Sequence, residues 1–176
     1  MSKVLEDLFM LSKSDENQVN LDCKQIDLKP LVEEICKHAE VLAEEKNIKI
    51  VIAFLEAVPI KGDEVRLRQM LWNILQNGIK YTQRGGELKI SLQNDGGGAM
   101  LTIQDTGIGI PEEDLSSIFN RFYRVDKART RDEGGSGLGL SICKQIAEAH
   151  KGTIEVESKL GVGTRFKIRL PNSGCL

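Results

Sequence analysis

The sequence predicts an α+β fold, a two-layer sandwich in which helices pack on one face of a mixed β-sheet. The order of the expected elements supports this prediction, because helical segments alternate along the chain with single or paired strands. The 40% hydrophobic content of the 176 residues suffices for one core, and no repeat or low-complexity run divides the chain. We therefore expect one main domain.

The first part of the chain is expected to lie outside this domain. Residues 4–11, VLEDLFML, have helical spacing but are too few for a helix that is stable alone, and the polar run SKSDENQVN that follows indicates a linker. The expected division is residues 1–15 as the remnant of an upstream dimerisation helix, 16–26 as linker, 27–171 as the domain and 172–176 as a C-terminal tail.

The first half of the domain is expected to contain two helices around one strand. Asp27 can cap the first helix, and the β-branched run IKIVIAFL at residues 48–55 predicts a strand. Asp63 can cap a long helix over residues 64–81, where apolar residues recur three and four positions apart.

The second half is expected to contain two hairpins with a helix between them. The segments GGELKISLQN and AMLTIQD form the first hairpin across DGGG, and GTIEVES and GTRFKIRL form the last across KLGV. Between them, PEEDLSSIF predicts a short helical turn, and the glycine-rich GGSGLGL opens a helix. The connection over residues 119–135 is long, and loops of that length are often functional lids or disordered.

Composition excludes several classes of function. A formal net charge of −2 and 5% aromatic residues argue against nucleic acid as a partner. No apolar run is long enough to cross a bilayer, and no secretory signal opens the chain. The four cysteines lack metal-ligand spacing, so we expect reduced thiols and a cytoplasmic location.

The glycine-rich loop predicts a phosphate site. It matches neither the P-loop, which needs GxxxxGK[ST], nor the dinucleotide fingerprint GxGxxG between strand and helix. A helix N-terminus still presents free N–H groups and a positive dipole end, and glycines let a phosphate approach closely. The alternative is a flexible linker, but the loop runs directly into an amphipathic helix.

Polar residues on the long helix form a second candidate cluster. Asn73 and Asn77 are four residues apart and face the same way, and Lys80 and Tyr81 continue that face one turn on. An amide oxygen is a ligand that Mg²⁺ accepts, and a lysine can reach a phosphate. The alternative is a solvated helix face with two incidental asparagines.

A third candidate is Asp105, which ends an apolar strand and begins DTGIGI. A carboxylate there can accept a hydrogen bond from the exocyclic amine of adenine, and it would reject the carbonyl of guanine. The alternative is a turn aspartate before glycine. In the basic stretch RFYRVDKARTR, most charges are expected to be solvated, and one or two could contact a γ-phosphate.

Four motifs together resemble the ATP-binding catalytic domain of sensor histidine kinases, which belongs to the gyrase, heat-shock chaperone, histidine kinase and MutL-type ATPase superfamily. NILQNGIKYT resembles the N box, DTGIGI the first glycine box, IFNRFYRVD the F box and GGSGLGLSICKQIAEAHKGTI the second glycine box. SKLGVGTRFKIRLP is similar to the closing strand pair. The resemblance implies a Bergerat-type ATP-binding fold and a bacterial two-component histidine protein kinase, with ATP and Mg²⁺ as cofactors.

The resemblance also implies roles for single residues. Asn77 would coordinate Mg²⁺, and Asp105 would hold the adenine amine with Thr164 beside it. The residues expected to bind the nucleotide are Asn73, Asn77, Lys80, Tyr81, Asp105, Gly107, Gly109, Phe122, Arg124, Gly135, Gly137, Leu138, Gly139 and Thr164, and Asn73, Lys80 and Arg124 are also expected to act in catalysis.

The same resemblance implies a lid over the nucleotide and a weak hydrolase activity. Phe119 and Phe122 would anchor the lid, and Arg124 would approach the γ-phosphate. Asn73 stands where hydrolases of the superfamily carry a glutamate that activates water, so slow ATP hydrolysis is expected. Gly78 stands where the family often has alanine, a change that removes no ligand.

The phosphoacceptor motif of such kinases, similar to SHELRTPL, is absent, and His38 and His150 lack its context and are expected to have no partner or chemical duty. The resemblance therefore implies a monomeric fragment. Its partners would be ATP, a dimerisation and phosphoacceptor domain and a response regulator, within a longer homodimer that could be anchored to a membrane. Three alternatives stay open, namely a regulatory nucleotide-binding module, a serine kinase of the anti-sigma type, and a hydrolase.

Overall fold

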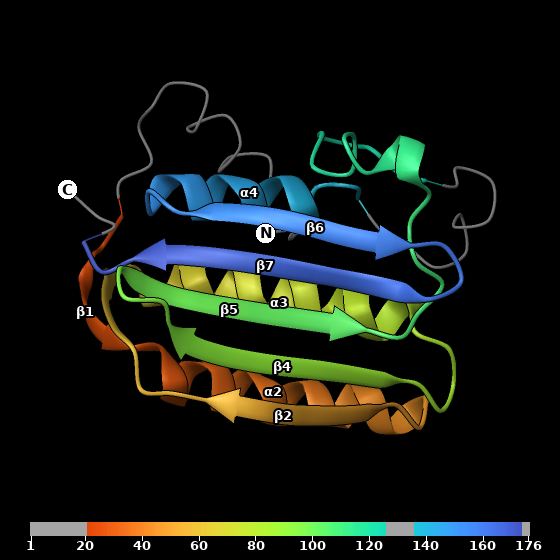
Figure 1. Cartoon of the computed structure of the whole chain (residues 1–176), viewed down its shortest axis with the longest axis horizontal. Coiled ribbons are helices and arrows are strands. Elements are labelled where there is room, and N and C mark those ends of the chain that lie inside the picture. The colour runs from red at the N-terminus through yellow and green to blue at the C-terminus, as the bar shows by residue number, and fades with distance from the viewer. Residues whose placement is uncertain (1–20, 126–135, 174–176) are drawn as a thin grey trace.

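The computed structural model describes residues 21–125 and 136–173, and it confirms the expected α+β architecture. Helices α2, α3 and α4 cover one face of a five-stranded sheet whose strand order is β2-β4-β5-β7-β6 (Figure 1). The elements are β1 (Lys24–Asp27), α2 (Leu28–Glu45), β2 (Lys49–Leu55), β3 (Pro59–Gly62), α3 (Glu64–Tyr81), β4 (Glu87–Asn94), β5 (Gly98–Asp105), the 3-10 turn η1 (Glu112–Asp114), α4 (Gly139–Ala149), β6 (Thr153–Lys159) and β7 (Gly163–Pro171).

The sheet is mixed, as the sequence predicts. Strand β2 runs parallel to β4, and the other neighbouring strands are antiparallel. Along β5, every second side chain is buried under the helices, from Ala99 through Leu101 and Ile103 to Asp105. The strand therefore ends with a carboxylate on its buried face, where an apolar residue would continue the pattern.

Two short strands were not predicted. Strand β1 pairs antiparallel with β3, with Lys24 opposite Gly62 and Asp27 opposite Pro59. Part of the expected linker over residues 16–26 is therefore a strand, while residues 1–20 lie outside the described part. Asp27 caps α2 as expected, because its carboxylate accepts from the Lys29 amide, and the same oxygen accepts from the Val58 amide next to β3, both at 3.0 Å.

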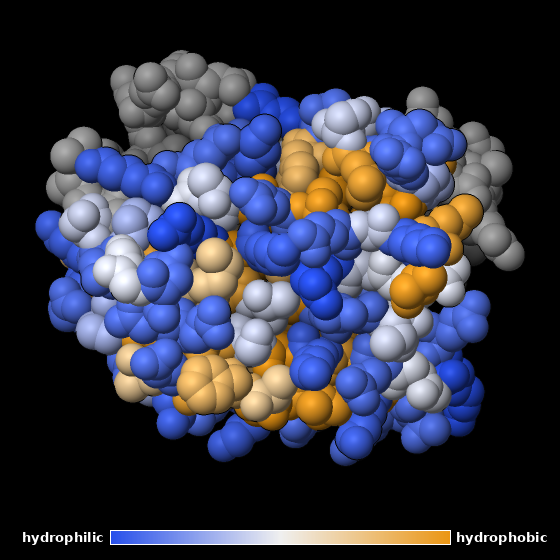
Figure 2. Space-filling view, viewed as in Figure 1, coloured by the Kyte–Doolittle hydropathy of each residue, from blue (hydrophilic) through white to orange (hydrophobic). Residues whose placement is uncertain are grey.

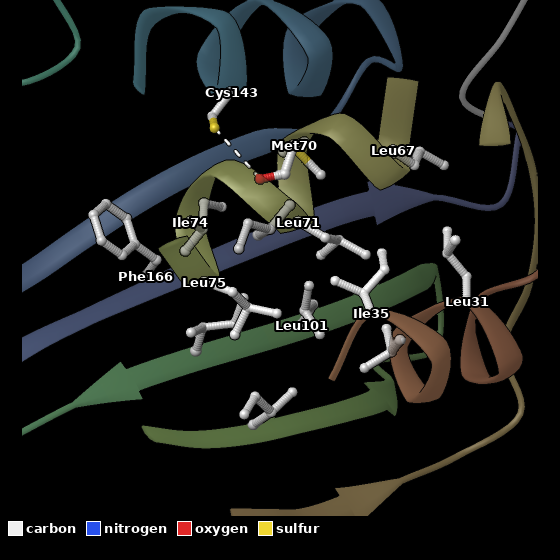
Figure 3. Close-up of a cluster of buried hydrophobic side chains, with 14 of the residues drawn as sticks. Leu31, Ile35, Leu67, Met70, Leu71, Ile74, Leu75, Leu101, Cys143 and Phe166 are labelled. Carbon is white, nitrogen blue, oxygen red and sulfur yellow. Dashed lines mark hydrogen bonds between the residues drawn. The ribbon is translucent and has the colours of Figure 1, made fainter. Parts of the chain in front are cut away.

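The hydrophobic core lies between the helices and the sheet, and α3 is at its centre. Figure 3 shows α3 side chains packed between the sheet and α4, and the Cys143 thiol of α4 donates to the Met70 carbonyl at 3.5 Å. Five large side chains of α3 are at most 4% exposed, namely Leu67, Met70, Leu71, Ile74 and Leu75. Burial of each stabilises the fold by about 1.5–3 kcal/mol, so the position of α3 is well determined.

None of the described helices covers the opposite face of the sheet, which is largely polar in Figure 2. There, Glu157 of β6 accepts from Arg165 and Lys167 of β7, and Arg165 also donates to Gln104 of β5. The two ion pairs of Glu157 are exposed, so each contributes little to stability. Among the described helices, none combines the length and the apolar composition needed to cross a bilayer.

The cysteines match the sequence expectation only in part. Cys36 and Cys143 are free and buried, and burial raises their thiol pKa values to about 11 and about 12, so both stay protonated. Cys23, however, is disulfide-bonded, which corrects the expectation that all four thiols are reduced.

His150 has partners, contrary to the sequence expectation. The ring is 1% exposed, its Nδ1–H donates to the Ile146 carbonyl at 2.7 Å, and its Nε2 accepts from the Asp63 amide at 3.0 Å. These two bonds fix a neutral ring that joins the end of α4 to the start of α3. Burial lowers the pKa of His150, which keeps it neutral.

Candidate functional site

The loop that follows β5 is fixed to three other elements. The Ile108 amide donates to the carbonyl of Tyr81 at the end of α3, at 3.2 Å, and the Ile108 carbonyl accepts from Gly161 in the β6–β7 turn at 2.7 Å. On the third side, the Thr106 amide donates to Glu87 at the start of β4 at 3.0 Å, and the Thr106 hydroxyl accepts from the Glu87 amide at 2.9 Å. The loop therefore has a defined position between α3 and the sheet.

Asp105, at the start of this loop, presents a half-satisfied carboxylate. The residue is 7% exposed, and its Oδ1 accepts from the Gly107 amide at 2.8 Å and from the Thr164 amide at 3.2 Å. Within the described residues, no hydrogen bond uses its Oδ2. Burial raises the pKa of Asp105 although both amides act to lower it. One oxygen is thus held in place, and the other can accept a proton donor from a ligand.

The two glycines of the loop are required by its own packing. A Cβ at Gly107 would lie 2.5 Å from the Tyr81 carbonyl oxygen. Gly109 has a φ of +70°, and a Cβ there would lie 2.1 Å from the carbonyl oxygen of Lys159. The sequence prediction that these glycines make room for a base is untested, and the structure supplies a separate reason for both.

Two hydroxyls stand beside Asp105. Thr164 is buried at the start of β7, and its Oγ1 lies 2.9 Å from the Oγ of Ser158. Its predicted place beside the adenine stays a prediction. Sequence reasoning missed Ser158. The available signal was its place in the alternating strand TIEVESK, where a hydroxyl follows Ile154 and Val156 at an inward-facing position.

The polar side of α3 meets the start of α4, as the sequence predicts. Asn73 is 8% exposed and its Nδ2 donates to the Gly139 carbonyl at 3.5 Å. Among the described residues, the nearest atom to a Cβ at Gly139 would be the Asn73 Cγ at 3.9 Å, so these residues leave space at this helix start. Asn77, one turn further along the same side of α3, is half-buried.

The last turn of α3 carries the other two residues predicted on this helix. Lys80 is half-buried, and its Nζ lies 5.4 Å from the ring centre of the exposed Tyr81. The Lys46 ammonium donates to the carbonyls of Ile79 and Lys80 at 3.2 and 2.9 Å. A cation thus satisfies the carbonyl end of the helix and fixes its position.

The glycine-rich loop is described from Ser136 onward, so Gly135 lies outside the described residues. Leu138 is fully buried, which places its side chain in the core and leaves only its backbone for a ligand. Its amide donates to the Ser136 hydroxyl at 3.3 Å. Gly137 has a φ of +72° and accepts from the Phe122 amide at 3.0 Å, so the loop is tied to the segment before residues 126–135.

The predicted lid anchors hold in different ways. Phe119 packs edge-on against Phe166 of β7 with ring centres 6.5 Å apart. The Phe122 ring is 59% exposed, so this residue is held through its backbone bond to the glycine loop rather than by its side chain. The Tyr123 hydroxyl donates to Asp114 of η1, and Arg124 is half-buried next to it. Lys127, Arg129 and Arg131 of the basic stretch lie outside the described residues.

Comparison with known proteins gives a consistent result. The family model of histidine kinase-, DNA gyrase B- and HSP90-like ATPases matches residues 62–174. The phosphate regulon sensor protein PhoR of Pseudomonas aeruginosa is 37% identical over 166 residues, which are 94% of this chain and 38% of PhoR. The sensor histidine kinase YclK of Bacillus subtilis is 37% identical over 172 residues, or 97% of this chain and 36% of YclK.

A solved structure agrees with these relatives. The crystal structure of full-length ShkA in complex with AMPPNP matches with a TM-score of 0.83 at 28% identity, and it covers 97% of this chain and 35% of ShkA. The chain therefore spans little more than a third of the length of these proteins. The matches confirm the fold and the resemblance that the sequence predicts.

Proposed function

Since this chain belongs to the family of histidine kinase-, DNA gyrase B- and HSP90-like ATPases and is an ATP-binding domain of the sensor histidine kinase type, we propose that it binds Mg·ATP and transfers the γ-phosphoryl group to a histidine of a separate helical hairpin. The observation that carries this proposal is Asp105, a buried carboxylate with one oxygen held by two amides. An acceptor of this kind suits the exocyclic amine of adenine.

The spacing of the site along α3 supports a triphosphate as the ligand. The first glycine box is bonded to Tyr81, and the start of α4 meets the helix at Asn73. Eight residues of helix separate these points, which is about 12 Å at 1.5 Å per residue. An extended nucleotide with its base near Asp105 matches this separation, and a single anion does not.

The phosphate end of the site would combine a helix start with neutral and cationic side chains. The first amides of α4 point away from the helix and favour an anion, and Gly139 leaves space in front of them. Lys80 and Arg124 supply positive charge, and the amide oxygen of Asn77 is a suitable Mg²⁺ ligand. The bound metal would neutralise phosphate charge, which is most of what phosphoryl transfer requires.

The character of Asn73 favours transfer to a histidine over hydrolysis. Its amide is not a useful base, and its Nδ2 is engaged with the Gly139 carbonyl. A water molecule would therefore receive little activation here, while a neutral imidazole already carries an unshared electron pair at neutral pH. We expect the chain to bind ATP and to hydrolyse it slowly.

The test mixes the purified chain with radiolabelled ATP, Mg²⁺ and the dimerisation and phosphoacceptor hairpin of the full-length kinase as a separate polypeptide. The proposal expects label on the hairpin that is labile in acid and stable in base, as for phosphohistidine. Acid-stable label on the hairpin would instead indicate a serine kinase. Release of phosphate without labelling would indicate a hydrolase, and ATP binding with neither labelling nor release would indicate a regulatory module. Samples with a Mg²⁺ chelator serve as the control.

The wider assembly is also a proposal. Relatives named as a sensor protein and a sensor histidine kinase support a dimerisation domain and a response regulator as partners, with this chain monomeric by itself and the longer protein a homodimer. Light scattering of the chain alone and joined to its hairpin tests this. The expected cytoplasmic position of the domain stays a prediction.

A further inference from the structure

Ser158 connects three segments around Asp105. Its side chain lies on the helix-covered face of β6, opposite Thr164 in the register of the sheet. Its Oγ accepts from the Ile110 amide at 2.8 Å and lies 2.9 Å from the Gly163 carbonyl oxygen and 2.9 Å from the Thr164 Oγ1. One hydroxyl thus joins the first glycine box to the β6–β7 hairpin.

The number of protons in this cluster determines the direction of each bond. Ser158 has one hydroxyl proton, and the Gly163 carbonyl can only accept, so that proton goes to Gly163. The two lone pairs of the Ser158 oxygen then receive the Ile110 N–H and the Thr164 O–H. The opposite direction between the hydroxyls would leave the Gly163 carbonyl without the serine proton, which is less favourable.

This arrangement leaves Thr164 as a pure acceptor. With its proton directed to Ser158, the Thr164 oxygen has only lone pairs to offer. The Thr164 amide donates to Asp105 Oδ1, so the residue that carries this hydroxyl is bonded directly to the carboxylate. Two adjacent groups therefore present acceptors and no donor.

We infer that Ser158 is a positioning residue that sets base specificity by holding the Thr164 hydroxyl in its acceptor orientation. This inference rests on the proposed function, because it takes the base of a nucleoside triphosphate to lie beside Asp105. An exocyclic amine supplies the donors that two acceptors need. A purine with a carbonyl in that place meets oxygen against oxygen, and a fixed Thr164 cannot rotate to donate to it.

A purely structural role of Ser158 makes a different prediction. Loss of the hydrogen bonds to Ile110 and Gly163 would loosen the loop and weaken the binding of every purine triphosphate by the same factor. If Ser158 instead orients the Thr164 hydroxyl, its loss changes the ratio of the dissociation constants for ATP and inosine triphosphate. Inosine triphosphate carries a carbonyl where ATP carries the amine. The ratio of the two dissociation constants therefore separates the two roles.

The experiment measures binding of ATP and of inosine triphosphate to the purified chain by calorimetry. In Ser158→Ala the Thr164 hydroxyl is free to donate, and we expect the preference for ATP to fall about three- to tenfold, the equivalent of one neutral hydrogen bond. Ser158→Thr keeps a hydroxyl and is expected to keep the wild-type ratio. Ser91→Ala, at a half-buried serine of β4, is the matched control.

A double-mutant cycle identifies the residue through which Ser158 acts. The change in ratio caused by Ser158→Ala should vanish in a Thr164→Val background. Ser158→Cys preserves volume and gives the same measurement if the alanine variant does not fold. A wild-type ratio in folded Ser158→Ala or Ser158→Cys, or an equal change in the Thr164→Val background, overturns the inference. Absence of ATP binding by the wild-type chain would instead refute the proposed function.

Discussion

Replacement of Asp105 by asparagine tests the base end of the site most directly. Asparagine is nearly isosteric and keeps a carbonyl oxygen, so the amides of Gly107 and Thr164 retain their acceptor. The second position changes from a carboxylate oxygen to an NH₂ group. A donor would then face the adenine amine, which is itself a donor.

The magnitude follows from the geometry. Because Oδ1 is occupied, only Oδ2 is available to the ligand, and one bond to a charged acceptor contributes about 1.5–3 kcal/mol. Its loss corresponds to an increase of about 10- to 150-fold in the dissociation constant for ATP. The free energy of unfolding should change by less than about 1 kcal/mol, because weaker amide bonds are offset by removal of a buried charge.

The pH dependence supplies a second signature. Burial raises the pKa of Asp105 above its ordinary value of 3.8, so the folded state disfavours the charged form. As the pH falls through the folded pKa, the wild-type carboxyl gains its proton, this burial penalty is relieved and ATP affinity declines. Asp105→Asn has no proton to gain, so neither its ATP affinity nor its stability should show this contribution.

Calorimetric titration with ATP and denaturant unfolding measure both quantities. Asp95→Asn is the matched control, because Asp95 lies in the turn at the other end of β5 and pairs with Arg169 at 2.7 Å. Unchanged ATP affinity in Asp105→Asn would refute the assignment of this carboxylate to the base. An equal loss of affinity in Asp95→Asn would refute it as well.

Three further predictions concern the fold and the metal. Burial lowers the pKa of His150, so the free energy of unfolding should fall as the pH drops below about 6.5. Urea unfolding at a series of pH values should show that this free energy depends less on pH in His150→Gln, while the exposed His38→Gln keeps the wild-type dependence. Gly161→Ala should cost about 1–2 kcal/mol for its positive φ, and Gly109→Ala about 2–5 because its Cβ also meets backbone, so equal losses in thermal unfolding would contradict the packing argument. Mg²⁺ should increase the ATP affinity of Asn77→Ala about tenfold less than that of the wild-type chain, when titrations with Mg²⁺ are compared with titrations in a chelator. An increase equal to that of the wild-type chain would exclude Asn77 as a ligand of Mg²⁺.

Several elements are determined by local patterns of residues. The bounds of α3 agree with the prediction over residues 64–81, because a cap at Asp63 and a regular apolar stripe act within one segment. The hairpins were likewise predictable from alternation and glycine turns. Strands β1 and β3 were missed because four residues carry too little alternation to show a period, and only their mutual pairing makes them strands.

Contacts between distant segments were beyond sequence reasoning. Ser158 and Ile110 are hydrogen-bonded across 48 positions of the sequence, and His150 and Asp63 across 87. The residues around Ser158 and His150 in the sequence do not indicate these partners. The glycines at 107 and 109 were assigned to a ligand, although the backbone of α3 and β6 already requires them.

The sequence by itself determined the residue types of the site, since motif letters and their order specify which donors, acceptors and flexible positions are present. Tertiary structure alone decided how those groups are used. A carboxylate such as Asp105 becomes a half-satisfied acceptor only where burial excludes water and two amides from separate segments occupy one oxygen. The physical reason is that hydrogen bonding and desolvation depend on distance in space, and the chain brings remote residues together only when the core forms.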